Sequence, residues 1–190
     1  MNKVRIDNHE FTLFRDYDRG DYHRLTFSGK ISYLRQRVDL ILIRPCQNAM
    51  EDAQNNNMGL IVATAICAGI SAASTFLHGK RASEKGDDRR FFNDFVKGYM
   101  SPVIANESEW LYRKIRCGLS HNFTILEGGI EVSLGSYVDK GRAEQEMDPQ
   151  IFLDDFAQGW SQFLDEVRRE GENSHPGKNF VKRFDEIFRD

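Results

Sequence analysis

Hydrophobic residues recur at helical spacing along most of the chain, which predicts a mainly α-helical protein. The pattern is clearest over residues 32–50, 59–77 and 148–169. The first stretch carries Pro45, which we expect to end or kink the helix, because proline lacks an N–H and clashes with the preceding turn. The third stretch opens with an Asp-Pro pair, which is typical of a helix start. Its apolar positions are Ile151, Phe152, Phe156, Trp160, Phe163, Leu164 and Val167.

Shorter helices are predicted over 91–100, 107–122 and 179–190. The segment 78–90 is polar, contains glycine and carries both signs of charge, so it is typical of a solvated loop. The 107–122 helix begins with acidic residues, which suit the positive end of the helix dipole. Its apolar stripe consists of Trp110, Leu111, Ile115 and Leu119.

Two regions depart from the helical pattern. Residues 1–30 mix charges, aromatic residues and turn formers, and they predict an N-terminal arm that is irregular or made of short strands. Residues 123–138 alternate around the sequence EGG, which is typical of a β-hairpin. We therefore expect a helical domain over 31–190. It should be an up-and-down bundle of four to five helices, with a small β-hairpin after the 107–122 helix.

The 59–77 stretch is 19 residues long without a charge, close to the length of a membrane-spanning helix. However, 11 of its 19 residues are Gly, Ala, Ser or Thr, which contribute little to transfer into a bilayer. We expect a core helix buried on most sides, and no membrane partner. Its helical seam consists of Val62, Ile66, Ile70, Ala73 and Leu77.

The composition fits one soluble globular domain, since 40% of the 190 residues are hydrophobic and 29% are charged. The formal net charge of −3 gives no global basic field that would indicate nucleic acid. The charge is uneven, because residues 1–138 have a balance of +2 and residues 139–190 a balance of −5. A polyanion would therefore meet the first part of the chain more favourably.

No metal or cofactor site is predicted. Cys46, Cys67 and Cys117 are widely spaced in apolar surroundings, no CxxC pair is present, and the five histidines are scattered. Reduced, mostly buried thiols are typical of a cytoplasmic protein. The N-terminal sequence MNKVRIDNHEF has no apolar signal-peptide segment. We expect a cytoplasmic location.

The 107–122 helix carries the candidate chemistry. In LYRKIRCGLSHNF, residues 111–123, four residues separate Arg116 from His121. A guanidinium is a permanent, fork-shaped cation and an imidazole titrates near neutral pH, so the two groups are suited to phosphodiester chemistry. RNA supplies its own nucleophile, the 2′-OH, and such a reaction needs no metal.

The spacing alone is not specific, because Arg168 and Arg169 precede His175 with six and five residues between them. In an α-helix, two side chains five residues apart lie about 140° apart around the axis and about 7.5 Å along it. One chain therefore flanks a phosphate only loosely. Two copies of the helix, packed antiparallel, would bring both pairs to one cleft.

Each motif residue also has an ordinary structural interpretation. His121 would be a cation at a helix C-terminus, favoured by the dipole, and Arg116 would pair with Glu109 on the surface. Gly118 would either permit a close approach or simply fit beneath the 59–77 helix.

Three neighbouring residues are candidate substrate contacts. Ser120 and Asn122 would either hydrogen-bond a phosphate or cap the helix end. Tyr112 would either stack on a base or pack against the protein, and we favour packing.

The sequence RCGLSH, together with the order of the predicted elements over roughly residues 31–170, resembles the R-x4-H signature of the HEPN superfamily (higher eukaryotes and prokaryotes nucleotide-binding). The resemblance implies a helical bundle that pairs as a homodimer. It also implies metal-independent endoribonuclease activity on RNA, common in toxin and phage-defence systems, with Arg116 and His121 from both chains as catalytic residues.

Family members often have Asn, Asp or His directly after the arginine, where this chain has Cys117. Some relatives bind RNA or nucleotides without cleaving them. Two other classes therefore stay open. One is a non-catalytic dimeric interaction module with an antitoxin or other regulatory protein as partner, and the other is a nucleotide-binding helical protein.

Overall fold

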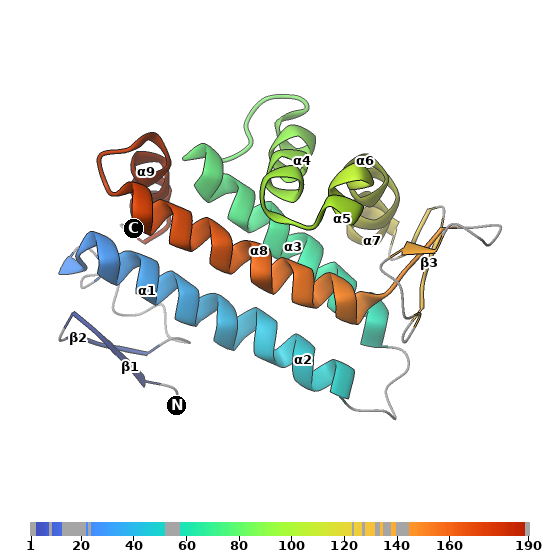
Figure 1. The fold of residues 1–190 in the computed structure, drawn as a ribbon, viewed down its shortest axis with the longest axis horizontal. Helices are drawn as coiled ribbons and strands as arrows, with labels where there is room; N and C mark the ends of the chain where they lie inside the picture. Colours follow the sequence, from blue (N-terminus) through green and yellow to red (C-terminus); the bar gives the residue numbers. More distant parts are fainter. Residues whose placement is uncertain are drawn as a thin grey trace.

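Within the described residues the protein is a mainly α-helical bundle with two small sheets, which confirms the predicted fold class (Figure 1). This structure is a computed structural model, and it describes residues 3–7, 9–12, 22, 24–51, 58–122, 124–126, 128–131, 134, 138, 139 and 145–188.

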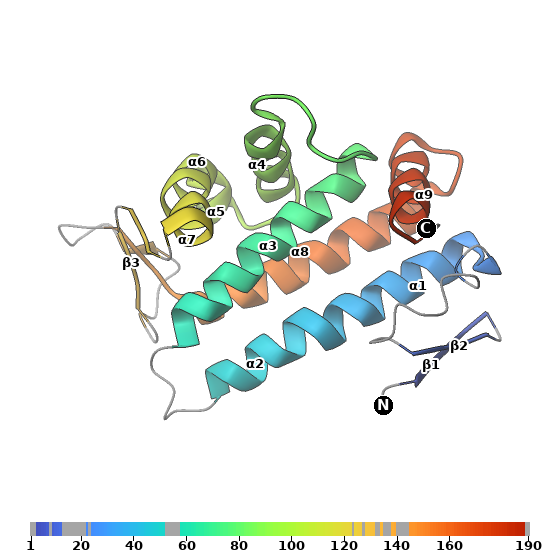
Figure 2. The same ribbon diagram turned by 180° about the vertical axis from the view of Figure 1, so that it is seen from behind.

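Three long helical rods form the body of the bundle (Figures 1 and 2). The first rod runs from α1 (Phe27–Val38) through a π-helical turn, η2 (Asp39–Ile43), into α2 (Arg44–Glu51). The other two rods are α3 (Met58–His78) and α8 (Pro149–Glu170). The first rod and α3 run in opposite directions, as in an up-and-down bundle, whereas α8 runs parallel to α3.

Pro45 widens the helix instead of ending it. It is the second residue of α2, and in the turn before it the Arg44 N–H donates to the Asp39 carbonyl, five residues earlier. A wider turn accommodates a proline, whose ring would otherwise clash with the carbonyl four residues earlier. α1 and α2 therefore continue as one rod.

The remaining helices pack across α3 and α8 on the side away from α1 and at one end of the bundle (Figure 1). They are α4 (Asp87–Tyr99), α5 (Pro102–Asn106), α6 (Ser108–Trp110), η3 (Leu111–Arg116), α7 (Cys117–Asn122) and α9 (His175–Phe188).

Three helices, α1, α4 and α9, begin four or five residues earlier than their apolar pattern predicts. α4 starts at Asp87, within the segment expected to be a loop, because the Asp87 carboxylate accepts hydrogen bonds from the backbone N–H groups of Ser83 and Glu84 (3.3 and 3.2 Å). α9 starts at His175, where the Ser174 hydroxyl accepts from the Gly177 N–H (3.1 Å). The Ser174 hydroxyl thus caps the start of α9, whereas the Asp87 carboxylate orders the turn before α4, whose N-cap residue Gly86 offers no side-chain hydrogen bond.

The short strands predicted near the N-terminus are present as β1 (Lys3–Ile6) and β2 (His9–Thr12), which pair antiparallel. Asp7 follows β1, and its carboxylate accepts hydrogen bonds from the backbone N–H and the hydroxyl of Thr26 (2.8 and 2.6 Å). Thr26 is the N-cap of α1. The β1–β2 pair is thereby held against the start of the bundle.

The β structure that follows the motif helix differs from the predicted hairpin over 123–138. β3 (Gly129–Ile130), β4 (Val138–Asp139) and β5 (Glu146–Met147) form one sheet in the order β3-β5-β4. β3 pairs in parallel with β5, and β4 pairs antiparallel to β5. The central strand of this sheet, β5, lies outside the predicted hairpin, and β3 and β4 do not pair with each other.

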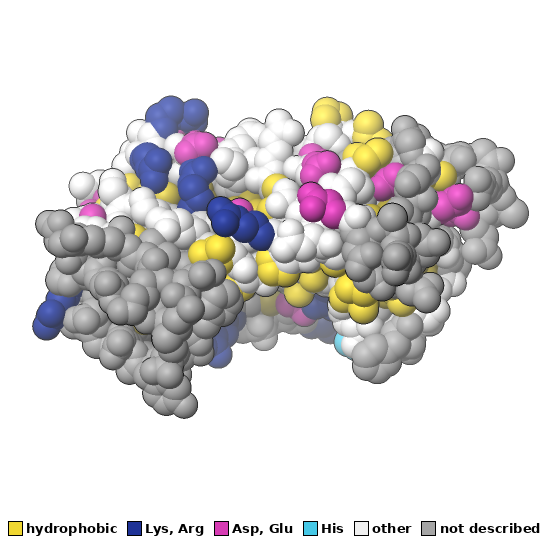
Figure 3. Space-filling view, turned by 90° about the horizontal axis from the view of Figure 1, so that it is seen from below, with side chains coloured by type: hydrophobic (Ala, Val, Ile, Leu, Met, Phe, Trp, Pro, Cys, Tyr) yellow, Lys and Arg dark blue, Asp and Glu magenta, His cyan; other side chains and the backbone are white. Residues whose placement is uncertain are grey.

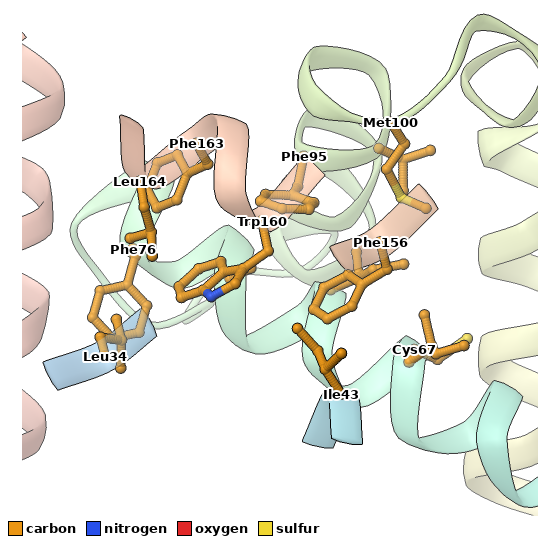
Figure 4. Packing of buried hydrophobic residues seen from close by; sticks show 14 of the residues in the cluster. Leu34, Ile43, Cys67, Phe76, Phe95, Met100, Phe156, Trp160, Phe163 and Leu164 are labelled. Carbon is orange, nitrogen blue, oxygen red and sulfur yellow. The ribbon is translucent and has the colours of Figure 1, made fainter. Parts of the chain in front are cut away.

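Aromatic side chains fill the core between α3, α4, α8 and α9. Figure 4 shows Phe95 of α4 and the α8 side chains Phe156, Trp160 and Phe163 pointing toward one another. The rings of Phe95 and Phe163 meet edge to face at 6.1 Å, a favourable geometry for an aromatic pair. The apolar face predicted for 148–169 is thereby confirmed as the main core face of the bundle.

α3 is the core helix, in contact with α2, α4, α8 and α9. Within the described residues it is also the one helix long and apolar enough to cross a membrane. Its seam residues Val62, Ile66 and Ile70 are at most 1% exposed, which favours the core helix of a soluble protein. The expectation of burial on most sides is only partly correct, because Leu60 and Ile61 are 39% and 59% exposed.

Candidate functional site

The predicted pair lies on one continuous helical segment formed by α6, η3 and α7, which we call the motif segment (Ser108–Asn122). It lies beside the β3–β5–β4 sheet at one end of the molecule (Figure 1). Three residues of the predicted apolar stripe, Leu111, Ile115 and Leu119, are at most 3% exposed. Because this stripe packs into the core, it determines which face of the segment points to solvent, and Ser120 and His121 lie on that exposed face.

The sequence predicted a regular α-helix over 107–122, but the segment is not regular throughout. Residues Leu111–Arg116 form a π-helical run, in which the Cys117 N–H donates to the Tyr112 carbonyl. Short π-helical insertions are uncommon and occur frequently at functional sites. The run ends at Arg116, one of the two predicted catalytic residues.

Arg116 lies at the edge of the bundle with its side chain 18% exposed. Its guanidinium stands over the Tyr112 ring, 5.3 Å from the centroid, and one terminal nitrogen lies 3.6 Å from the Asp88 carboxylate of α4. Burial raises the pKa of the Cys67 thiol on α3 to about 12, and the nearby Arg116 cation opposes this rise. The side chain is therefore held between α3, α4 and the motif segment.

The expected ion pair between Arg116 and Glu109 is not formed. Glu109 instead binds Arg89 of α4 and Arg113, four residues along the motif segment, and it accepts a further hydrogen bond from Asn93 (3.1 Å). Burial alone would raise the pKa of Glu109, but these three partners hold it below its usual value. Glu109 thus ties the motif segment to α4.

Asp88 was not recognised from the sequence as a neighbour of the motif. The sequence GDDRR (86–90) could have shown that a helix begins there, because two acids directly after a glycine are typical of a helix N-terminus. It could not have shown that this helix packs beside Arg116. Asp88 is 61% exposed, so its ion pair with Arg116 is of the solvent-screened kind. An incoming phosphate can compete with such a partner.

His121 is exposed in the last turn of α7. Among the described residues, no hydrogen bond or ion pair joins it to Arg116. This agrees with the wide angular separation expected for five helical residues. The imidazole is therefore open to solvent and is not part of the core.

The three candidate substrate contacts have different surroundings. Tyr112 packs edge to face on Phe92 (5.5 Å between ring centroids), so the favoured packing interpretation is confirmed. Burial raises the pKa of Tyr112, and a hydrogen bond with Cys117 adds to the rise. Ser120 is exposed. Asn122 ends α7, and its side chain lies outside the described structure.

Gly118 is required by a close approach of the chain itself. After α7 the chain turns back, and the Leu126 N–H donates to the Lys114 carbonyl (3.2 Å). A Cβ at position 118 would overlap the Thr124 carbonyl oxygen and stand 3.2 Å from the Leu126 nitrogen. The predicted close approach is therefore confirmed, and the three atoms nearest to that Cβ belong to Thr124 and Leu126 and not to α3.

α4 and the motif segment together carry more basic than acidic side chains, six against four. The bases are Arg89, Arg90 and Lys97 of α4 and Arg113, Lys114 and Arg116 of the motif segment, and the acids are Asp87, Asp88, Asp94 and Glu109. In the described part of the chain, no group of three or more His, Cys, Asp or Glu residues could hold a metal ion.

No protein-family model matches the chain, and no curated protein and no solved structure gives a match. Any inference about function therefore depends on the residues and contacts of this chain alone.

Proposed function

We propose that the protein is a HEPN-like, metal-independent endoribonuclease that works as a homodimer, of the kind found in toxin and phage-defence systems. Arg116 and His121 are its catalytic residues, and the substrate is RNA. The observation that supports the proposal best is the exposure of the His121 imidazole on the same helical segment as Arg116.

Arg116 suits the role of an electrostatic stabiliser. Its guanidinium is oriented by the Tyr112 ring and retains an exposed edge, and its ion pair with Asp88 at 3.6 Å is long and open to solvent. A phosphate group would accept two parallel N–H···O bonds from the Arg116 guanidinium, which is the shorter, bidentate contact that arginine favours. The cation would then stabilise the additional charge of the pentacoordinate phosphate.

His121 suits the role of proton carrier. In the proposed reaction the 2′-oxygen attacks the adjacent phosphorus, the bond to the 5′-oxygen breaks, and a 2′,3′-cyclic phosphate and a 5′-hydroxyl result. One imidazole accepts the 2′-OH proton and a second, protonated imidazole donates a proton to the leaving oxygen. Two such groups are supplied if each subunit contributes its His121 to a shared cleft.

The experiment is cleavage of a fluorogenic RNA in the presence of EDTA. We expect cleavage to persist in EDTA and to fall at least about 100-fold in His121→Ala and Arg116→Ala, since general acid–base and electrostatic groups contribute this much. The cleaved fragment should carry a 5′-hydroxyl, and a substrate with a single 2′-deoxy residue should resist cleavage at that position.

The chain offers matched controls. His175 is exposed at the start of α9, and Arg113 is exposed one turn from Arg116, so His175→Ala and Arg113→Ala should retain cleavage. Cleavage that disappears in EDTA, or that survives in His121→Ala, would refute the proposal. RNA binding without cleavage, weakened in Arg116→Ala alone, would assign the protein to the non-catalytic binders.

The homodimer is tested separately by light scattering at a protein concentration of about 20 µM, well above the dissociation constant of a stable dimer. A dimer is expected. A monomer at this concentration would remove the shared cleft and the two-histidine mechanism with it.

A further inference from the structure

A groove lies on the side of the bundle opposite α4, between the first helical rod and α3 (Figure 2). Its volume is ≈ 340 Å³, and nearly all of its lining is hydrocarbon. α8 forms its floor, and the end of α9 closes one side. The lower face of the molecule, on which the first rod lies, also carries hydrophobic side chains along its middle (Figure 3). Such a lining favours an occupant with an apolar body.

The α3 wall of the groove is covered at Gly69. A Cβ at this position would meet Cδ2 of Leu42 at 2.6 Å and Cζ of Phe156 at 2.8 Å. Because α8 runs parallel to α3, Trp160, one turn after Phe156, lies beyond this contact, toward α9. The lining residues on that side are Leu34, Ala72, Ala73, Phe76, Trp160 and Phe188.

Trp160 supplies a buried polar group at the floor of the groove. The residue is 3% exposed, and its Nε1–H has no hydrogen-bond partner in the part of the chain that the structure describes. In Figure 4 the nitrogen edge of the indole faces the space between Leu34 and Ile43, along the first rod. A buried N–H without an acceptor is destabilising, because it has lost its bond to water.

The two polar side chains of the described lining, Trp160 and Arg37, are both donors. The Arg37 guanidinium already donates to the Tyr33 hydroxyl (3.2 Å) and lies over the Phe188 ring, 5.9 Å from its centroid. We therefore assign Arg37 no contact with a ligand. A charged ligand would have to leave water for hydrocarbon walls, and a ligand O–H or N–H would find no acceptor on these two side chains. The lining thus disfavours both charge and donors.

We infer that the groove binds a small, uncharged aliphatic carbonyl compound, such as a methyl ketone. Its oxygen accepts the hydrogen bond of the Trp160 Nε1–H, and its alkyl chain lies against the apolar walls. Solvent does not reach this nitrogen in the free protein, so the new bond replaces no bond between the protein and water. The oxygen reaches the nitrogen when a side chain of the lining, such as Leu34, changes rotamer.

The volume of the groove limits the size of the ligand. Liquid water takes about 30 Å³ per molecule, so ≈ 340 Å³ holds about 11 non-hydrogen atoms at that spacing. The methyl ketone 2-heptanone fits within this limit. The groove is separate from the motif segment, so the inference is independent of the proposed ribonuclease activity.

Binding of 2-heptanone to the full chain, measured by calorimetry, tests the inference. Heptanoate has the same chain length and carries a charge, so it is the matched control ligand. We expect saturable binding of 2-heptanone with one site per chain. Heptanoate should bind at least about 10-fold more weakly, because its carboxylate would lose water on entering the groove.

Nuclear magnetic resonance shows whether the donor is Trp160. The chain has two tryptophans, Trp110 and Trp160, which give separate indole N–H signals in a ¹⁵N-correlated spectrum. The ketone should move the Trp160 signal downfield and leave the signal of Trp110, in the motif segment, in place. With 2-heptanone labelled with ¹³C at the carbonyl, the bound signal should lie further upfield in Trp160→Phe than in the parent, because accepting a hydrogen bond moves this signal downfield.

Three variants locate the ligand. Trp160→Phe keeps a ring and removes the donor, so the dissociation constant should rise about 2- to 10-fold. Ala72→Phe fills the groove from an exposed position on α3 and should abolish binding. Gln162→Phe, on the exposed face of α8 outside the groove, is the matched control and should bind like the parent.

The inference is overturned if 2-heptanone shows no saturable binding, if heptanoate binds as tightly, if Ala72→Phe binds as well as Gln162→Phe, or if the Trp160 indole signal does not move at saturation. A ketone-independent dimer that Ala72→Phe disrupts would assign the groove to a second copy instead. Each variant is first checked for a cooperative thermal transition, so that loss of binding is not loss of fold.

Discussion

The return of the chain over α7 makes Gly118→Ala an informative substitution. Alanine in place of glycine within a helix usually stabilises a protein by about 0.4–1 kcal/mol, because alanine lowers the conformational entropy of the unfolded chain. At position 118 the new methyl group would overlap the Thr124 carbonyl oxygen and press on the Leu126 nitrogen. Both neighbours are backbone atoms, so neither can rotate away as a side chain would.

The expected cost follows from these contacts. Forcing a methyl group into a closed space costs about 1–3 kcal/mol. Moving the return segment away also loses the hydrogen bond from the Leu126 N–H to the Lys114 carbonyl, worth about 1 kcal/mol. After subtracting the helix gain, Gly118→Ala should be destabilising by about 1–3 kcal/mol. For a chain of this size the midpoint of thermal unfolding should fall by roughly 3–9 °C.

Urea unfolding followed by circular dichroism measures the effect, and Gly98 supplies the control. Gly98 is an exposed residue of α4, and a Cβ there would meet nothing within 4 Å. Gly98→Ala should therefore leave stability unchanged or increase it by up to about 1 kcal/mol. If Gly118→Ala stabilises the protein as Gly98→Ala does, the return segment does not lie against α7.

Three further substitutions test other contacts. Asp148→Ala removes the carboxylate that caps α8 by accepting from two backbone N–H groups, and urea unfolding should show a loss of about 1 kcal/mol. Burial against Phe91 lowers the pKa of His78, so the unfolded chain binds a proton more readily than the folded protein does. The free energy of unfolding should therefore fall as the pH drops below about 6.5. In His78→Gln, urea unfolding at a series of pH values should show a weaker dependence on pH. Asp88→Asn removes the carboxylate beside Arg116, and if the ribonuclease proposal is correct, filter binding should show RNA affinity increased about 2- to 5-fold.

The long helices could be predicted because their apolar spacing persists over several turns. The 148–169 pattern corresponds to α8 within one residue at each end, and its Asp148 cap is present. The 59–77 stretch corresponds to α3 within one residue at each end. In such segments the same residues satisfy both the local pattern and the core, so propensity and packing agree.

The strand pairing could not be predicted for a physical reason. β3, β4 and β5 have two residues each, too few for alternation to distinguish one register or partner from another. β5 begins at Glu146, well after the EGG sequence at 127–129, so no tight-turn sequence indicates that it pairs with β3. The pairing is decided by tertiary contacts, including the close approach of Gly128 to the Gln145 carbonyl.

The candidate site was predicted in its residues but not in its surroundings. The spacing of Arg116 and His121 is visible in the sequence, and both lie at the accessible edge of the motif segment. Asp88 and Cys67 lie beside Arg116 only because α4 and α3 pack there, which no local pattern specifies. The small residues of α3 indicate close helix packing, and only the structure shows that Ala65, Ala68 and Ala72 line a groove beside the first rod.

The order of the rods along the chain has a consequence for synthesis on the ribosome. α3 ends at His78, whereas α8, which packs along it, begins only at Pro149. At typical elongation rates of about 5–20 residues per second, the nascent chain carries a 21-residue apolar helix for roughly 4–14 s before α8 even begins to be made. During that interval α3 has the hydropathy of a membrane segment, and we expect chaperones that bind emerging apolar stretches to shield it until the bundle closes.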